Sequence, residues 1–225
     1  MSKKPTGFTG PIRIKIDKYS KQFKFQPINW PKEKEEIEKI IVSNFIKTIQ
    51  AAGATVLNHF PNPQNDLDYT LILPGGEVYL ELKEVIFPMQ NDKNKNSPIY
   101  SKEPHFWNYG DIENWFLNQI KKYSKKYKGV NKPIHLLFYT THFDYNFEDE
   151  VVWLIQYSLT KTPHIFECIF LYQPLDKNTG DLRVFYPSKA KEDFKSFQKS
   201  LGKDFINKLR EKHFFNFSPF KWKIG

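Results

Sequence analysis

The chain has 225 residues, of which 40% are hydrophobic and 26% are charged. This length corresponds to one domain, or one domain with a small appendage, and the composition excludes an intrinsically disordered chain. Lysine and arginine number 34 against 25 acids, a formal net charge of +9. The charge predicts a polyanion as partner, most often nucleic acid, and a basic solvated surface is the alternative. Because nearly all the basic residues are lysine, contact with phosphates is favoured over reading of bases.

Cysteine usage and hydropathy exclude several further classes. Cys168 is the single cysteine, which rules out a disulfide framework and a cysteine-based zinc site within one chain. It lies in an apolar run and is expected in the core. No sequence window is apolar enough to span a bilayer, and the N-terminus lacks a hydrophobic signal core. We therefore expect a cytoplasmic protein without a membrane partner.

The first half of the chain alternates short strands with one helix. Alternating isoleucines over residues 12–16 predict a strand, and Pro31 opens a helix over residues 31–52 that ends at Gly53. Acids behind the proline favour that helix end: Glu33, Glu35, Glu36 and Glu38. Its apolar residues recur every four positions and form one buried stripe. A strand over residues 54–57 and a loop over 60–65 are expected next.

The second half adds further strands and helices. A hairpin is expected over residues 66–85, a long loop over 88–110, and a helix from Asp111 to about Tyr127. Later strands are expected over residues 134–139, 151–157, 165–172 and 182–186, terminal helices over 188–200 and 203–213, and an aromatic tail over 214–225. This order predicts one α/β domain over residues 1–225, with a mixed central β-sheet flanked by helices.

The hairpin gathers the charged residues that can carry chemistry. With Gly75-Gly76 as a two-residue turn, Asp68 faces Lys83 and Thr70 faces Glu81. Side chains alternate along a strand, so these four residues share one face and hydrophobic residues occupy the other. Carboxylates roughly 5–8 Å apart repel each other unless a cation lies between them, and Mg²⁺ with oxygen ligands satisfies both. Lys83 beside the ion could hold an attacking water, which is the equipment of phosphodiester hydrolysis. The alternative is an exposed strand with a cross-strand ion pair.

Asp68, followed after twelve residues by Glu81-Leu-Lys83, resembles the PD-(D/E)XK, or restriction-endonuclease-like, nuclease superfamily. The resemblance covers about residues 32–140 and implies a restriction-endonuclease-like core with C-terminal additions over 141–225. It implies hydrolysis of DNA with Mg²⁺, for which Mn²⁺ can substitute; RNA is the alternative substrate. Asp68 and Glu81 would hold the metal, and Lys83 would position the water. Leu67 stands where the family name has proline, and Asp66 is an alternative ligand on the same face.

Two helices are implied to complete this site. In the family a glutamate of the preceding helix often adds a metal ligand, and Glu38 adjoins the buried stripe of that helix. Gln119 and Tyr123 resemble the Gln-x-x-x-Tyr motif of RecB-type members, which positions the substrate and the catalytic groups. Positions i and i+4 share one helix face. The alternative is a surface glutamine and a core tyrosine.

A run of lysines follows Gln119 on the same predicted helix: Lys121, Lys122, Lys125 and Lys126. If Gln119 faces the metal, these lysines lie within reach of the flanking phosphates, and interleaved tyrosines can stack on bases. A solvated helix face is the alternative. A second function from another class is a catalytically inactive nuclease-like protein that binds nucleic acid, alone or as a subunit of a larger DNA-processing complex. A homodimer is compatible with either function.

Overall fold

The computed structural model describes residues 12–16, 21–25, 28–63, 66–86, 107–141, 147–176, 178–202 and 204–214. The chain divides into two compact units. Unit 1 comprises Met1–Val85, Lys132–Phe143 and Ile169–Arg183, and unit 2 comprises Ile86–Asn131, Asp144–Cys168 and Val184–Gly225. The long loop predicted over residues 88–110 lies outside the described residues as far as residue 106, and so does the aromatic tail from residue 215.

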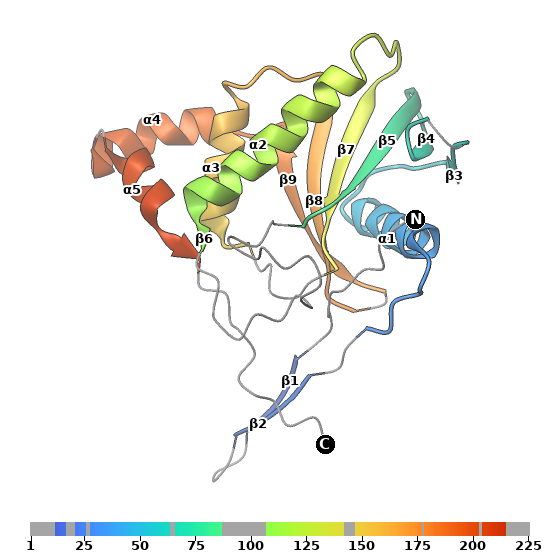
Figure 1. Cartoon of the computed structure of the whole chain (residues 1–225), viewed down its shortest axis with the longest axis horizontal. Coiled ribbons are helices and arrows are strands. Elements are labelled where there is room, and N and C mark those ends of the chain that lie inside the picture. Colours follow the sequence, from blue (N-terminus) through green and yellow to red (C-terminus); the bar gives the residue numbers. More distant parts are fainter. Residues whose placement is uncertain are drawn as a thin grey trace, which may run out of the picture. The chain divides into compact units, whose positions relative to one another are not determined.

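A mixed six-stranded sheet forms the framework of unit 1, with the strand order β3-β4-β5-β7-β8-β9 (Figure 1). The strands are β3 (Asn58–Pro61), β4 (Tyr69–Leu73), β5 (Gly76–Glu84), β7 (Ile134–Tyr139), β8 (Cys168–Pro174) and β9 (Gly180–Tyr186). Strands β3, β4 and β5 are antiparallel, whereas β5 and β7 are parallel. The mixed α/β class predicted from the sequence is confirmed.

Helix α1 (Lys34–Ala51) packs on one face of this sheet (Figure 1). Its stripe of Ile37, Ile41 and Phe45 is fully buried, as the four-residue spacing predicts. The stripe shares a core cluster with the following sheet residues: Leu71, Leu80, Leu82, Leu137 and Tyr139. The helix begins at Lys34 and not at Pro31, with Glu33 in extended conformation as its N-cap.

Three predictions for the N-terminal part need correction or addition. The strand expected over residues 54–57 lies at Asn58–Pro61, and its last two residues fall in the segment predicted as a loop over 60–65. Pro61 is compatible with pairing because β3 is an edge strand, where a missing N–H breaks no ladder. The predicted strand over residues 12–16 is confirmed as β1 (Ile12–Ile16), which pairs with an unanticipated strand β2 (Lys21–Phe25).

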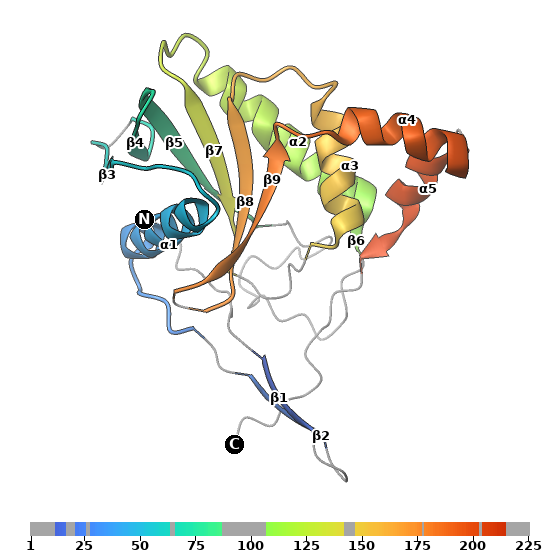
Figure 2. The ribbon, with the colours of Figure 1, turned by 180° about the vertical axis from the view of Figure 1, so that it is seen from behind.

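Unit 2 consists mainly of helices. They are α2 (Tyr109–Lys126), α3 (Asp149–Leu159), α4 (Ala190–Leu201) and α5 (Phe205–Glu211), and a short antiparallel pair joins β6 (Trp107–Asn108) to β10 (His213–Phe214). Figure 2 shows α4 and α5 beside α3. The Phe116 ring of α2 contacts Phe147 and Phe185 edge-on, with ring centroids 5.6 and 5.1 Å apart. No helix within the described ranges combines the length and the apolarity that crossing a bilayer requires.

One element of unit 2 is predicted as the wrong type. The strand expected over residues 151–157 is the helix α3. This helix buries residues on nearly all of its sides, so its sequence carries a continuous apolar run instead of a 3.6-residue period. Helix α2, predicted from Asp111, begins two residues earlier at Tyr109, and its N-cap is Asn108, whose side chain accepts a hydrogen bond from the backbone N–H of Asp111 at 2.8 Å.

Candidate metal and nucleic-acid site

The hairpin β4–β5 has a register that differs from the predicted one by two residues. Leu73 pairs with Gly76, so Pro74 and Gly75 form the turn, and the predicted Gly75-Gly76 turn is wrong. Gly76 has a φ of 127°, a conformation that a residue with a Cβ rarely adopts. A shift of two residues leaves every side chain on its predicted face, because the strand period is two. It changes the opposing pairs, so that Thr70 faces Tyr79 instead of Glu81.

The corrected register bears directly on Asp68. Tyr69 pairs with Leu80, and one further step along the same register sets Asp68 opposite Glu81, not opposite Lys83. The Asp68 carboxylate oxygen Oδ2 accepts a hydrogen bond from the backbone N–H of Leu82 at 2.7 Å. Leu82 is the middle residue of the Glu-x-Lys triplet. The half-buried Asp68 is therefore fastened to β5 between Glu81 and Lys83.

Asp66, the alternative ligand, is placed differently. Its side chain is exposed, and its Oδ1 accepts a hydrogen bond from the backbone N–H of Leu67 at 2.7 Å. This local turn satisfies the carboxylate without contact to β5. Leu67, which stands where the family name has proline, is buried and belongs to the core. Of the two aspartates, Asp68 is the one whose carboxylate is bonded to β5.

Glu81 is buried at 4% exposure, and Lys83 two residues further is half-buried on the same face of the strand. Both lie away from α1, because the intervening Leu80 and Leu82 belong to the core cluster under that helix. Acidic side chains are rarely buried unless a cation or hydrogen-bond donor compensates their charge. A buried glutamate within a Glu-x-Lys triplet is therefore a costly feature for an ordinary surface strand.

Glu38 lies on α1 in a separate set of contacts. It is buried at 7% exposure, the Lys34 ammonium lies 3.0 Å from its Oε1, and the Tyr139 hydroxyl donates to the same oxygen at 3.2 Å. Burial raises the pKa of Glu38, Lys34 opposes that rise, and the nearby negative charge of Asp68 adds to it. The charge of Asp68 therefore influences Glu38.

Three further residues belong with Glu38 and Asp68 and were not predicted as site residues: Lys34, Glu84 and Tyr139. Glu84 pairs in register with Tyr139, and its Oε1 accepts a hydrogen bond from Thr141 Oγ1 at 2.6 Å. Burial lowers the pKa of Lys34, but the carboxylates of Glu38, Asp68 and Glu84 outweigh it, and the net pKa is raised. Burial raises the pKa of Tyr139 above its usual range, and the same carboxylates add to the rise. Several carboxylates thus act on one ammonium group.

Two sequence signals pointed to these residues. Lys34 stands four positions before Glu38, a spacing that forms ion pairs on a helix, and Glu84 directly follows the Glu-x-Lys triplet. Neither signal shows on its own that α1 lies against the end of β5. That proximity comes from the tertiary fold.

The carboxylates do not form a complete metal cage. Among the described residues, no three His, Cys, Asp or Glu side chains are grouped so that together they could hold a metal ion. Glu38, the predicted third ligand, is held by Lys34 and Tyr139. Asp68 and Glu81 fit a different mode, since Mg²⁺ is usually bound by one or two carboxylates and completes its shell with waters and substrate phosphates.

Gln119 and Tyr123 lie on α2 in unit 2, whereas the acids and Lys83 lie in unit 1. Both side chains are half-buried, and their i, i+4 spacing puts them on one helix face. Gln119 is therefore not a fully exposed glutamine, and Tyr123 is not a fully buried tyrosine. Their part in a site with Asp68 and Glu81 stays a prediction.

The lysines predicted to contact phosphates are all exposed: Lys121, Lys122, Lys125 and Lys126. Next to them, the rings of Tyr123 and Tyr127 are stacked with centroids 6.2 Å apart. The Lys126 ammonium lies over both rings, 4.4 Å from the Tyr127 centroid and 5.7 Å from that of Tyr123. The C-terminal half of α2 therefore combines exposed lysines with the half-buried ring of Tyr123, whereas Tyr127, the C-cap, is buried.

Comparison with known proteins leaves the site to be judged on its own geometry. No protein-family model matches the chain, and no curated protein does. A solved structure of Pyrococcus furiosus SfsA in complex with Ca²⁺ is similar at 13% sequence identity and a TM-score of 0.27. The match covers 67% of this chain and 61% of the SfsA chain. A TM-score of 0.27 is too low to assign a shared fold.

Proposed function

We propose that the protein is a metal-dependent nuclease that hydrolyses phosphodiester bonds of DNA. The observation that supports this most directly is the hydrogen bond from the Leu82 N–H to Asp68 Oδ2, which fastens one carboxylate beside the buried Glu81. An aspartate bonded to the backbone of a Glu-x-Lys triplet is positioned by the fold, not by a flexible surface strand. The net charge of +9 supports a polyanionic substrate.

Asp68 and Glu81 would hold Mg²⁺, with Mn²⁺ as a substitute. Asp68 Oδ2 accepts the Leu82 N–H, which fixes the orientation of the carboxylate beside Glu81. The bound metal supplies Lewis-acid activation of the scissile phosphate and lowers the pKa of a bound water. Glu38 adds negative charge near Asp68 and would become a third ligand on release from Lys34.

Lys83 would position the attacking water and balance the negative charge that develops on phosphate. In hydrolysis, the water oxygen forms a bond to phosphorus, the bond to the leaving sugar oxygen breaks, and that oxygen takes a proton. Lys83 is half-buried and shares a strand face with Glu81, so the position of its ammonium group is restricted. Gln119 and Tyr123 would orient the substrate, and the exposed lysines of α2 would contact the flanking phosphates.

The test is DNA cleavage by the full chain, with Asp68→Asn compared against Asp66→Asn. Plasmid and single-stranded DNA are incubated with Mg²⁺, Mn²⁺ or EDTA, and RNA is included as an alternative substrate. We expect metal-dependent products, a loss of at least about 100-fold in rate for Asp68→Asn, and near-normal rates for Asp66→Asn. Equal loss in both variants, or cleavage that persists in EDTA, would discard the proposed site.

A binding protein without catalysis is the second candidate, and one observation favours it. The described residues contain no preformed three-ligand metal group, and the Lys34 ammonium already pairs with Glu38. In this alternative, lysine charge replaces metal charge among the carboxylates, and the protein holds DNA alone or within a larger complex. DNA retention in EDTA, with no product under either metal, is the outcome that identifies it.

A further inference from the structure

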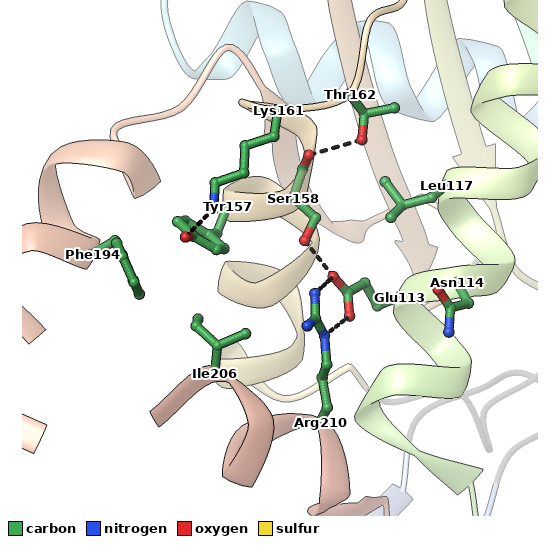
Figure 3. Close-up of a pocket in the computed structure, with 10 residues that line it drawn as sticks. All are labelled: Glu113, Asn114, Leu117, Tyr157, Ser158, Lys161, Thr162, Phe194, Ile206 and Arg210. Atoms are coloured by element: carbon green, nitrogen blue, oxygen red, sulfur yellow. Dashed lines mark hydrogen bonds and ion pairs between the residues drawn. The ribbon is translucent and has the colours of Figure 1, made fainter. Parts of the chain in front are cut away.

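A cavity in unit 2 is lined by residues that have no role in the proposed nuclease. Helices α2, α3, α4 and α5 contribute to its lining (Figure 3). Its volume is about 420 Å³. Ligand pockets of proteins occupy roughly 300–1,000 Å³, with apolar walls and a few placed polar groups. This cavity is at the lower end of that range, so its occupant is a small molecule or one terminal group of a polymer.

One cation in the lining lacks a carboxylate partner. The Lys161 ammonium donates a hydrogen bond to the Tyr157 hydroxyl and lies 4.1 Å from the centroid of that ring. It also lies 5.7 Å from the Phe194 centroid. No carboxylate of the described residues forms an ion pair with Lys161. Two aromatic rings thus restrict an ammonium at the cavity wall while its charge remains available to an anion.

The other two charges in the lining neutralise each other. The Arg210 guanidinium binds the buried Glu113 through Nε at 2.7 Å and Nη2 at 2.9 Å, and the Ser158 hydroxyl also donates to Glu113 (Figure 3). The remaining guanidinium nitrogen, Nη1, keeps its N–H groups for another acceptor. The net charge of the lining is therefore positive and is carried by Lys161.

The hydroxyl groups of the lining are ordered as acceptors. Ser158 donates its proton to Glu113, and Thr162 donates to the Ser158 carbonyl at 2.9 Å, so both hydroxyl oxygens retain lone pairs for a ligand. Asn114 adds an amide with both a donor and an acceptor, and Leu117 and Ile206 supply apolar wall. A matching ligand combines an anion, hydrogen-bond donors and an apolar surface.

We propose that this cavity binds a nucleoside 5′-monophosphate group, with the phosphate at Lys161 and Arg210 Nη1. The base and sugar supply the N–H and O–H donors that face Ser158 and Thr162. Such a group is available from two sources, a free nucleotide or the 5′-phosphorylated end of a DNA strand. The inference rests on unit 2 alone and does not require the proposed nuclease.

The experiment is isothermal titration calorimetry on the full chain, which measures the affinity for thymidine 5′-monophosphate, thymidine and inorganic phosphate. EDTA is present to prevent cleavage. We expect the monophosphate to bind at least about tenfold more tightly than either fragment, because only the monophosphate engages both ends of the cavity. Lys161→Met should weaken binding about tenfold, whereas Lys191→Met, an exposed lysine of α4 outside the cavity, should leave it unchanged. Leu117→Trp, which fills the cavity without altering charge, should also weaken it.

Additional measurements distinguish a free nucleotide from a DNA strand end, and the cavity from the proposed nuclease site. A 5′-phosphorylated oligonucleotide that binds more tightly than the free nucleotide, and than its 5′-hydroxyl form, identifies a strand end. A free nucleotide that binds more tightly identifies a small-molecule site. Asp68→Asn should bind the monophosphate like the wild type, which shows that the cavity is not the nuclease site. Unchanged affinity in a folded Lys161→Met protein, or inorganic phosphate binding as tightly as the monophosphate, would overturn the inference.

Discussion

Each compact unit buries a glutamate on a helix, and the two are stabilised in different ways. Glu113 in unit 2 is 2% exposed and receives two hydrogen bonds from Arg210 and one from Ser158. Glu38 in unit 1 shares the single ammonium of Lys34 with the carboxylates of Asp68 and Glu84. One glutamate has a dedicated cation, whereas the other shares Lys34 with two further carboxylates.

This contrast separates a structural ion pair from a candidate functional site. A buried acid that only stabilises the fold is expected to be fully compensated, because an uncompensated charge is costly. Carboxylates that share one cation are found where their negative charge has a function, and a divalent cation is the ion that such carboxylates bind. The carboxylates that share Lys34 in unit 1 are therefore the better candidate for a functional group, and the balanced pair in unit 2 is the better candidate for a structural one.

The largest effect is expected for Glu81→Gln and Lys83→Met. We expect each to lower the metal-dependent cleavage rate by about 10³-fold, since one removes a metal ligand and the other removes the charge beside the water. Glu77→Gln is the matched control, because Glu77 is an exposed glutamate on the same strand and the same face. Initial rates of plasmid cleavage measure the effect. Equal rates for Glu81→Gln and Glu77→Gln would remove Glu81 from the site.

Arg210→Met is expected to give the largest loss of stability. It leaves Glu113 buried without its cation, and we expect the free energy of unfolding to fall by about 3 kcal/mol. Lys34→Met should cost about 1 kcal/mol or less, because Lys34 is 47% exposed and its pair with Glu38 is a partly solvated one. Urea denaturation at pH 7 compares them. The double variant Arg210→Met/Glu113→Gln should regain part of the loss, and no recovery would contradict the assignment of a structural pair.

The sequence predicted the two faces of the hairpin better than its register. The turn was misplaced because Gly75 and Gly76 are both suited to it, and the structure uses Pro74 and Gly75. The faces were nevertheless correct, since a slip of two residues preserves the alternation. The pairing of Asp68 with the Leu82 N–H could not be predicted, because it depends on the register that the turn sets.

Other wrong or missing predictions also arise because a sequence pattern covers only neighbouring residues. Helix α3 was predicted as a strand because its β-branched and aromatic residues form an unbroken apolar run, and a helix buried on nearly all sides has no polar stripe. The contacts that link Glu38 to Tyr139 join residues 101 positions apart, which no local pattern reveals. Element type was predictable where one face is polar, as in α1 and α2, and failed for α3, which has no polar face.

Acid sensitivity should also differ between the units. Burial lowers the pKa of His135 in unit 1 to about 4, and it lowers the pKa of the half-buried His164 in unit 2. A histidine with a lowered pKa contributes stability above its unfolded pKa near 6.5 and loses it as the pH falls through the folded value. For His135 this loss amounts to about 3 kcal/mol between pH 7 and pH 4, at about 1.4 kcal/mol per pH unit.

Replacement of each histidine tests that difference. His135→Leu should flatten the decline of unfolding free energy below pH 6.5, whereas His164→Leu should change the slope less, because His164 is less buried. Urea denaturation between pH 4 and pH 7 measures both. A steeper dependence on His164 than on His135 would assign the acid sensitivity to unit 2.

The smallest effect is expected for Glu38→Gln, and it tests directly how Lys34 is shared among carboxylates. Burial raises the pKa of Glu38, so the stability that its protonated form contributes is complete below the unfolded pKa and is lost as the pH rises through the folded pKa. At pH 7 to 8 the ionised Glu38 is therefore a burden, and glutamine should raise the free energy of unfolding by less than about 1 kcal/mol after loss of the Lys34 pair. The gain should vanish near pH 4. Glu113→Gln should instead destabilise the protein at pH 7, because it breaks a compensated pair; a gain in both variants would show that the two glutamates do not differ.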